Sequence, residues 1–202
     1  MTKQQNDLKK ISNFLFEAGM LAKTPRSGFH FLGSGDQSIS EHISRTMYVG
    51  FALCQMSKKK LNVGKILQMC LFHDFAEART SDLNYIHQKY VSADEEKALK
   101  DMVKEIPFGL KIWEVLSEYK ERKTYEALIT KDADNIEWIL SLKEEYDIGN
   151  GRAKTWLPSA VKRLKTVEAK QLAKVILATP SDSWWFSNKK DKWWVSRNKK
   201  TK

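Results

Sequence analysis

The sequence predicts an all-α protein, and three observations support this fold class. Glycine and proline are scarce, with 9 and 4 among 202 residues, which favours long helices over many short strands joined by turns. Apolar residues recur at three- and four-residue spacing, which is the period of an amphipathic helix. No segment alternates apolar and polar residues in the manner of a β-strand, and no internal repeat is present.

The first predicted helix covers residues 7–22 and carries an apolar face that includes Ile11, Phe14 and Leu15. Residues 23–38 follow, with one proline and three glycines, and are predicted to form a loop. A loop of this length inside a compact domain is often functional, so this segment is a candidate part of a site.

The next two helices have recognisable starts. Ser38 and the glutamate three residues on form a capping box, which opens a helix that runs to about Met56. Asn62 is a candidate N-cap for the third helix, whose apolar residues lead directly to the pair His73-Asp74.

The remaining helices are predicted in the same way. Ser92 and Glu95 form a second expected capping box, before a helix that Pro107 ends. A shorter helix follows, and then a long one over residues 124–146. The last clear helix is expected over residues 159–178.

Composition predicts a cytoplasmic globular protein. Hydrophobic residues make up 42% and charged residues 30%, which is ordinary for a soluble domain. No stretch approaches the roughly 18 apolar residues of a membrane span, and the polar N-terminus lacks the apolar core of a signal peptide. Cys54 and Cys70 show no disulfide-framework spacing, which favours a reducing compartment.

The net charge of +10 is concentrated in a C-terminal tail. From residue 187 onward, seven basic residues oppose only Asp191, so this segment carries +6 and the rest of the chain +4. We therefore predict one domain over residues 1–180 and a tail rich in Trp and Lys over residues 181–202. Aromatic residues among cations suit weak contact with nucleic acid or a membrane interface. For residues 184–186, packing on the domain is the favoured alternative.

Polar residues that interrupt the apolar pattern point to a metal site. His73 and Asp74 end a core-facing helix, where burying them is costly unless something pairs with them. A divalent cation compensates both, because imidazole nitrogen and carboxylate oxygen are its usual ligands. His42 lies on the preceding helix, and Asp132 and Asp134 interrupt the interior of the long helix. Three helices can therefore offer ligands to one point, as in helical-bundle metal sites.

The specificity of these signals differs. A lone histidine near a helix end is more often a hydrogen-bonded structural residue than a ligand, and His30 and His87 are interpreted in that way. An isolated His-Asp pair is a weak motif. The ordered set of His, then His-Asp, then Asp on helices is much more specific, and Glu77 and Asp82 downstream strengthen it.

With these residues in order, the chain resembles the HD-domain phosphohydrolases, and among them the YfbR-like and HD-containing 5′-deoxynucleotidases. The resemblance covers roughly residues 10–146 and rests on Thr24-Pro25-Arg26-Ser27-Gly28, Glu41-His42, His73-Asp74-x-x-Glu77-Ala78-Arg79-Thr80-Ser81-Asp82 and Lys131-x-x-Asp134-x-x-Glu137. It implies an HD-domain helical bundle with a metal site between core helices. Because members of the family are commonly dimers, it also implies a homodimer.

The resemblance implies that four residues bind a divalent metal: His42, His73, Asp74 and Asp134. The family's distant ligand stands three residues before a glutamate, which selects Asp134 over Asp132. The metal is one of Co, Mn, Zn, Fe or Mg, and the motif does not choose among them.

The resemblance also implies that Glu77 and Arg26 are catalytic and that Arg26, Phe29 and Asp82 contact the substrate. We expect Glu77 to orient the attacking water or shuttle its proton. Arg26 is expected to hold phosphate oxygens, and Asp82 to bond the 3′-hydroxyl of the sugar. Two departures leave the base or sugar preference open, because Phe29 stands where the family usually has Trp and Ser81 where it usually has Gly.

The expected function is hydrolysis of 2′-deoxynucleoside 5′-monophosphates to nucleoside and phosphate, by in-line attack of a water that the metal activates. A dNTP triphosphohydrolase would use the same ligands and is the main alternative. An alternative of another class is a non-catalytic scaffold that binds nucleotide or nucleic acid. Arg26 is the only cation from Thr24 to Ser38, which favours a single phosphoryl group. Lys120, Lys123 or Lys131 would change this count by folding toward the site.

Overall fold

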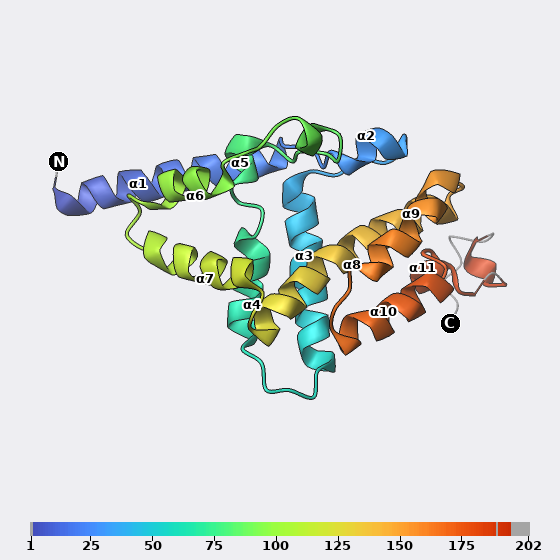
Figure 1. The fold of residues 1–202 in the computed structure, drawn as a ribbon. Helices are drawn as coiled ribbons and strands as arrows, with labels where there is room; N and C mark the ends of the chain where they lie inside the picture. The colour runs from blue at the N-terminus through green and yellow to red at the C-terminus, as the bar shows by residue number, and fades with distance from the viewer. Residues whose placement is uncertain (1, 189, 195–202) are drawn as a thin grey trace.

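The computed structural model describes residues 2–188 and 190–194, and the regular secondary structure of these residues is helical (Figure 1). The α-helices are α1 (Lys3–Ala18), α2 (Gly28–Leu32), α3 (Ile39–Met56), α4 (Val63–Phe72), α5 (Glu77–Thr80), α6 (Glu95–Val103), α7 (Gly109–Glu121), α8 (Tyr125–Asp147), α9 (Gly151–Lys162), α10 (Val167–Ala178) and α11 (Ser183–Phe186). Short 3₁₀ helices are η1 (Gly19–Ala22), η2 (His87–Lys89) and η3 (Lys192–Trp194). Among the described helices, none has the length and apolar character needed to cross a membrane. The all-α prediction is confirmed.

Several predicted helix starts are confirmed. Ser38 and Glu41 form both bonds of a capping box at the start of α3. Asn62 caps α4 by accepting the backbone N–H of Lys65. The start of α6 differs, because Asp94 and not Ser92 supplies the capping oxygen.

The helix predicted over residues 159–178 is two helices, α9 and α10, separated by residues 163–166. The Asp132 carboxylate on α8 accepts the backbone N–H groups of Lys165 and Thr166, at 3.0 and 2.6 Å, and the Thr166 hydroxyl at 2.7 Å. Thr166 in turn caps α10. The prediction failed because a contact from a distant helix leaves no periodic signal in the sequence.

Helix α8 is the centre of the fold and packs against α3, α4, α7, α9 and α10. Figure 1 shows α8 crossing the middle of the molecule, with α7 on one side and α9 and α10 on the other. Two hydrophobic clusters meet there, one around Leu53 and Ile136 and the other around Ile43 and Leu116. Helices α3, α4 and α8 contribute residues to both clusters. Hydrophobic packing on two sides therefore fixes the positions of these three helices.

Helix α1 begins earlier than predicted, at Lys3, and extends beyond the body of the molecule (Figure 1). Phe14 packs against Phe75 and Phe108, with ring centroids 5.2 and 5.5 Å apart. Leu15, which the periodicity placed on the same apolar face, is 62% exposed. That part of the prediction is wrong, because only a narrow stripe of α1 reaches the core.

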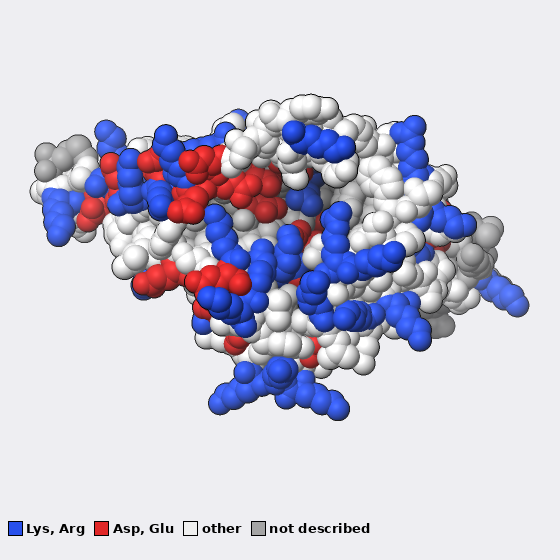
Figure 2. Space-filling view, in the orientation of Figure 1, with Lys and Arg blue, Asp and Glu red and all other residues white. Residues whose placement is uncertain are grey.

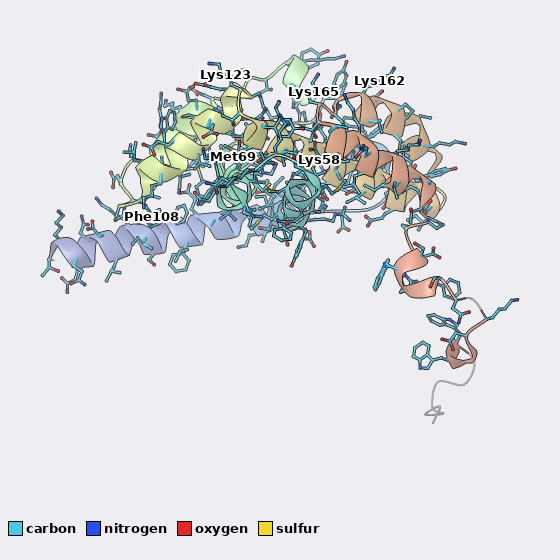
Figure 3. The ribbon with its side chains drawn as sticks, turned by 90° about the horizontal axis from the view of Figure 1, so that it is seen from below. Lys58, Met69, Phe108, Lys123, Lys162 and Lys165 are labelled. Carbon is cyan, nitrogen blue, oxygen red and sulfur yellow. The ribbon has the colours of Figure 1, made fainter. Side chains whose placement is uncertain are left out.

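The residues after α10 form a small aromatic cluster that stands off from the helical body (Figure 3). Ring centroids of Trp185 and Phe186 lie 5.6 and 4.9 Å from that of Trp194. Trp184 is 84% exposed. The expectation that these aromatic residues pack on the domain is therefore wrong, since they pack mainly on one another.

This placement agrees with a domain over residues 1–180 and a separate tail, and that division stays a prediction. Residues 189 and 195–202, which carry much of the tail's positive charge, lie outside the described residues. Contact of the tail with nucleic acid also stays a prediction.

Candidate metal centre

A cavity of about 1030 Å³ lies where α4, α7, α8 and α9 face the segments that follow η1 and α4. Six of the predicted site residues line it: Arg26, His73, Asp74, Glu77, Asp82 and Asp134. His42 is fully buried directly behind His73, and Phe29 is buried outside the cavity lining. His30 and His87 are exposed and also lie outside this lining, which agrees with their exclusion as ligands.

Four of these residues converge on one point. The Nε2 atoms of His42 and His73 are 3.2 Å apart. The His42 Nε2 atom lies 3.4 Å from Asp74 Oδ2 and 3.3 Å from Asp134 Oδ1. The same Asp74 oxygen is 3.2 Å from His73 Nε2. Two imidazole nitrogens and two carboxylates aimed at one another are a suitable donor set for a divalent cation.

Local structure fixes both imidazole rings so that Nε2 faces this point. His42 lies in the first turns of α3, and its Nδ1 atom is 2.5 Å from Glu137 Oε2. His73 follows the last residue of α4, and its Nδ1 atom is 2.8 Å from the carbonyl oxygen of Cys70. A second partner at Nδ1 is the usual way in which proteins orient a metal-binding histidine.

Glu137 supports His42 from behind. It is fully buried and accepts hydrogen bonds from Gln37 at 2.7 Å and from Arg45 Nε at 2.9 Å. Burial opposes its negative charge, but His42 and Arg45 outweigh this effect and lower the pKa of Glu137 to about 2. The sequence marked this residue only as a motif position, and its supporting contact was not foreseen.

The electrostatics of the centre favour bound positive charge. Burial opposes ionisation of Asp74 and Asp134, yet the neighbouring histidines, with Lys131 in the case of Asp134, hold both carboxyl pKa values below the usual range. Burial and Arg26 oppose protonation of His42, but the surrounding carboxylates raise its pKa well above its usual value. A cation that binds here replaces that proton, because a histidine ligand must be neutral.

The two aspartates of α8 face different surroundings. Asp132 is 1% exposed, and its carboxylate accepts a hydrogen bond from the backbone N–H of Thr166 at the start of α10. Asp134 lines the cavity, contacts His42 and forms a 2.6 Å ion pair with Lys131. This geometry supports the choice of Asp134 as the candidate ligand.

The loop that carries Arg26 is pinned at several points. The Arg26 backbone N–H donates to the Gln37 carbonyl at 2.8 Å, and its side-chain Nη1 lies 3.4 Å from Asp74 Oδ2. The next amide, that of Ser27, donates to Asp82 Oδ2 at 2.8 Å. Asp82 therefore also anchors the loop, and Arg26 is held beside the candidate metal ligands.

Phe29 does not reach the cavity, contrary to the expectation of a substrate contact. It is 8% exposed and packs edge-on against Trp138, with ring centroids 5.4 Å apart. Trp138 and Trp156 line the cavity themselves. A Cβ atom at Gly28 would lie 3.0 Å from the Trp138 ring, so glycine permits this close approach. The sequence carries no local signal for this pair of cavity-lining rings, because they meet only through tertiary packing.

Glu77 opens the short helix α5 and lines the cavity. Its Oε2 atom is buried and has no hydrogen-bond partner among the described residues. Burial, with Asp74 and Asp82 nearby, raises the pKa of Glu77 to about 9.

Ser81, at the end of α5, has φ 59° and ψ 165°, a conformation that usually requires glycine.

Arg26 is not the only cation beside the site, because two of the three lysines that were expected to change the count do fold toward it. Lys120, Arg122, Lys131 and Arg163 line the same cavity, whereas Lys123 does not. In Figure 2 a hollow in the visible face is bordered by Lys and Arg along its lower side and by Asp and Glu at its upper left. The helix ends that bring these cations together are distant in sequence, so the count within one loop missed them.

Comparison with known proteins agrees with this geometry. The family described as HD domain matches residues 18–176. The 5′-deoxynucleotidase HDDC2 of Xenopus laevis is 26% identical over 176 residues, which cover 83% of this chain and 86% of that protein.

Two solved structures share the fold. A predicted metal-dependent phosphohydrolase from Magnetospirillum magnetotacticum is 18% identical with a TM-score of 0.69, over 88% of this chain and 94% of that one. The cyanophage S-2L HD phosphohydrolase DatZ, bound to dA and one catalytic Zn²⁺ ion, is 21% identical with a TM-score of 0.52. That match covers 81% of this chain and 96% of the other.

Proposed function

Because the chain belongs to the HD domain family of metal-dependent phosphohydrolases, we propose that it removes the 5′-phosphate of 2′-deoxynucleoside monophosphates. The products are the deoxynucleoside and inorganic phosphate. The similarity to 5′-deoxynucleotidase HDDC2 supports this substrate class. The deoxyadenosine and zinc in the cyanophage protein are further support, since that protein has the same fold.

The observation that carries the proposal is the cluster of His42, His73, Asp74 and Asp134 beside Arg26. His73, Asp74 and Asp134 line one cavity with Arg26, and His42 lies buried behind His73. We assign the four clustered residues as ligands of a divalent cation. When bound, such a cation polarises a phosphoryl oxygen and makes water a stronger nucleophile. Arg26 adds a planar donor that suits two phosphate oxygens at once.

Other side chains of the cavity have separate roles in the proposed reaction. Glu77 orients the attacking water and shuttles its proton, because the residue lines the cavity near Asp74 and one of its carboxyl oxygens has no hydrogen-bond partner among the described residues. Asp82 accepts a hydrogen bond from the 3′-hydroxyl of the sugar while it holds the Arg26 loop. Trp138 and Trp156 offer apolar ring surface to the base.

The test is a screen of deoxynucleoside and ribonucleoside monophosphates with Co²⁺, Mn²⁺, Zn²⁺, Fe²⁺ and Mg²⁺, measured as phosphate release. We expect release from deoxynucleotides that stops on addition of EDTA and returns with excess cation. Binding of nucleotide without release at any cation would instead support the non-catalytic scaffold.

Adding deoxynucleoside triphosphates to the screen, with analysis of the phosphate products, tests the triphosphohydrolase alternative, which the additional cations of the cavity favour. Release of tripolyphosphate from a dNTP, with no phosphate from monophosphates, would replace the proposed reaction by that one. The homodimer and the cytoplasmic location remain predictions from the sequence.

A further inference from the structure

The C-terminal tail, residues 181–202, lies beyond the part of the chain that matches the HD domain family, which ends at residue 176. Of the tail residues that the structure describes, none lines the cavity. Five of them form one aromatic cluster: Trp184, Trp185, Phe186, Trp193 and Trp194. A role for this cluster therefore has to lie outside the hydrolytic reaction.

The base of the tail is fixed to the helical body. The backbone N–H of Ser181 donates to Asp147 Oδ2 at 2.7 Å, at the end of α8. Asp147 also forms an ion pair with Lys143, which is only 6% exposed. Helix α11 begins two residues after Ser181, and Figure 3 shows it beyond the end of the helical body. The aromatic cluster is thus held at one end of the molecule, outside the core.

The rings of the cluster pack around Trp194. Its centroid lies 5.6 Å from that of Trp185 and 4.9 Å from that of Phe186. The centroid of Trp193 is 5.1 Å away on the same residue's ring. Asp191 supports this arrangement, because its Oδ1 atom accepts the backbone N–H of Trp193 at 2.9 Å. Residues on both sides of Asp191 therefore form one joined apolar surface.

Much of this apolar surface is open to water. Trp184 is 84% exposed, and Trp185 and Trp193 are each 52% exposed. Contiguous exposed aromatic surface is typical of an interaction site. An indole ring suits the boundary between water and a lipid bilayer, because its ring is apolar and its N–H is polar.

Positive charge accompanies the exposed rings. Residues 187–202 carry +6, with Asp191 as their single acid. Each Lys or Arg close to an anionic bilayer contributes about fivefold in affinity, which is about 1 kcal/mol. The charge of the tail therefore complements a bilayer that contains anionic lipid.

Single-stranded nucleic acid fits the cluster less well. Bases stack on the free faces of separate aromatic rings. In the cluster, the Trp194 ring meets its three neighbours at interplanar angles of 66°, 78° and 80°, so ring edges lie against ring faces. This packing gives a compact apolar surface and not a row of stacking platforms.

We propose that the tail attaches the protein to the surface of an anionic lipid bilayer. The rings of Trp184, Trp185 and Trp193 lie at the level of the lipid headgroups, and the positive charge of the tail is attracted to the lipid phosphates. The cavity stays open to soluble nucleotide, because the described tail residues lie outside its lining. This inference goes beyond the proposed function and does not depend on it.

Sedimentation of the full chain with sucrose-loaded vesicles tests the attachment. Vesicles of phosphatidylcholine alone are compared with vesicles of equal parts phosphatidylcholine and phosphatidylglycerol. We expect the wild-type chain to bind the anionic vesicles at least tenfold more tightly, and added salt to weaken this binding. No binding to anionic vesicles at low salt would overturn the proposal.

Replacing aromatic residues tests whether the rings take part. Trp184→Ala combined with Trp193→Ala should weaken binding to anionic vesicles by at least tenfold, which is about 1.4 kcal/mol. Neither residue belongs to a hydrophobic cluster of the body, so the melting temperature should stay that of the wild-type chain. Unchanged vesicle binding by this variant would reduce the attachment to attraction between charges and would overturn the role of the rings.

Replacing lysines tests whether the charge acts locally. Lys190→Gln combined with Lys192→Gln should weaken binding by about 25-fold, or fivefold for each cation. The matched control is Lys58→Gln combined with Lys60→Gln, which removes the same charge from an exposed basic run between α3 and α4. Figure 3 shows Lys58 apart from the tail, so the control should leave binding unchanged.

Equal effects of the two lysine pairs would mean that only the net charge matters, and would overturn the proposal. A titration with a single-stranded oligonucleotide completes the test. Binding to the oligonucleotide that the aromatic replacements abolish, without binding to vesicles, would replace the bilayer by nucleic acid. A chain that hydrolyses no nucleotide would leave every one of these outcomes readable, so the two proposals can fail separately.

Discussion

Replacing Asp132 and Asp134 in turn distinguishes a residue that holds the start of α10 from a candidate metal ligand on the same helix. The Asp132 carboxylate accepts three hydrogen bonds at the start of α10, two of them from backbone amides. Asp132 is 1% exposed and Thr166 is 3% exposed, so water cannot easily replace the lost acceptor. Asp132→Ala therefore leaves buried donors without a partner.

The magnitude follows from these contacts. A lost capping acceptor costs about 1 kcal/mol, and each buried donor left unpaired costs about 1–3 kcal/mol before the chain relaxes. Allowing for relaxation, we expect Asp132→Ala to lower the free energy of unfolding by about 2–4 kcal/mol. In a chain of this length, 1 kcal/mol shifts the melting temperature by roughly 2–4 °C. The expected decrease is therefore roughly 4–16 °C.

The assay is thermal unfolding of each variant in EDTA and with excess Mn²⁺, together with the metal content of the protein. Asp132→Ala should melt lower than the wild-type chain in both buffers and still gain stability from Mn²⁺. Asp134→Ala should lose that gain, because the cation loses a ligand. An Asp132→Ala protein that keeps its stability in EDTA but binds no metal would refute the assignment of the two aspartates.

His42→Ala is expected to abolish cation binding, measured as metal content, because it removes a candidate central ligand; full metal content would contradict its assignment. Glu77→Gln should keep the cation and lower turnover by roughly 10²- to 10⁴-fold, the range for a lost acid–base group, and loss of the metal would make Glu77 a ligand instead. Ser81→Gly should raise the free energy of unfolding by about 1 kcal/mol, because glycine adopts this positive φ without strain, and an unchanged urea midpoint would argue against strain there. Removing residues 187–202 should leave phosphate release largely unchanged and abolish any salt-sensitive binding to nucleic acid in a titration at increasing salt, since +6 of the charge lies there. A truncated chain that no longer folds would show that the tail is part of the core.

The sequence predicts the features that local pattern determines. Periodicity and capping residues indicate α3, α4 and α8, because each signal lies within one helix. The candidate ligands are visible for the same reason, since His73 and Asp74 are polar residues at the end of an apolar run. Their order along the chain then suffices to suggest that they meet.

Features that depend on tertiary contacts are missed. The break before α10 depends on Asp132, which is more than 30 residues away in sequence. Trp156 and Arg163 enter the cavity only because α9 packs against α8, and neither belongs to a motif. Phe29 was expected to contact the substrate because it follows a family motif in sequence. It packs against Trp138 instead and does not line the cavity.

The candidate ligands lie far apart along the chain, and His42 contacts Glu137 across 95 residues. Closing a segment of this length costs chain entropy, which is offset only once α3, α4 and α8 have packed. A cation bound by the candidate ligands His42 and Asp134 would act as a reversible cross-link over the same segment. Because its ligands come from different helices, such a cation would bind once these helices have assembled and would oppose their separation. Since contacts that form late in folding mainly slow unfolding, removing the cation should shorten the lifetime of the folded chain more than it changes the folding rate.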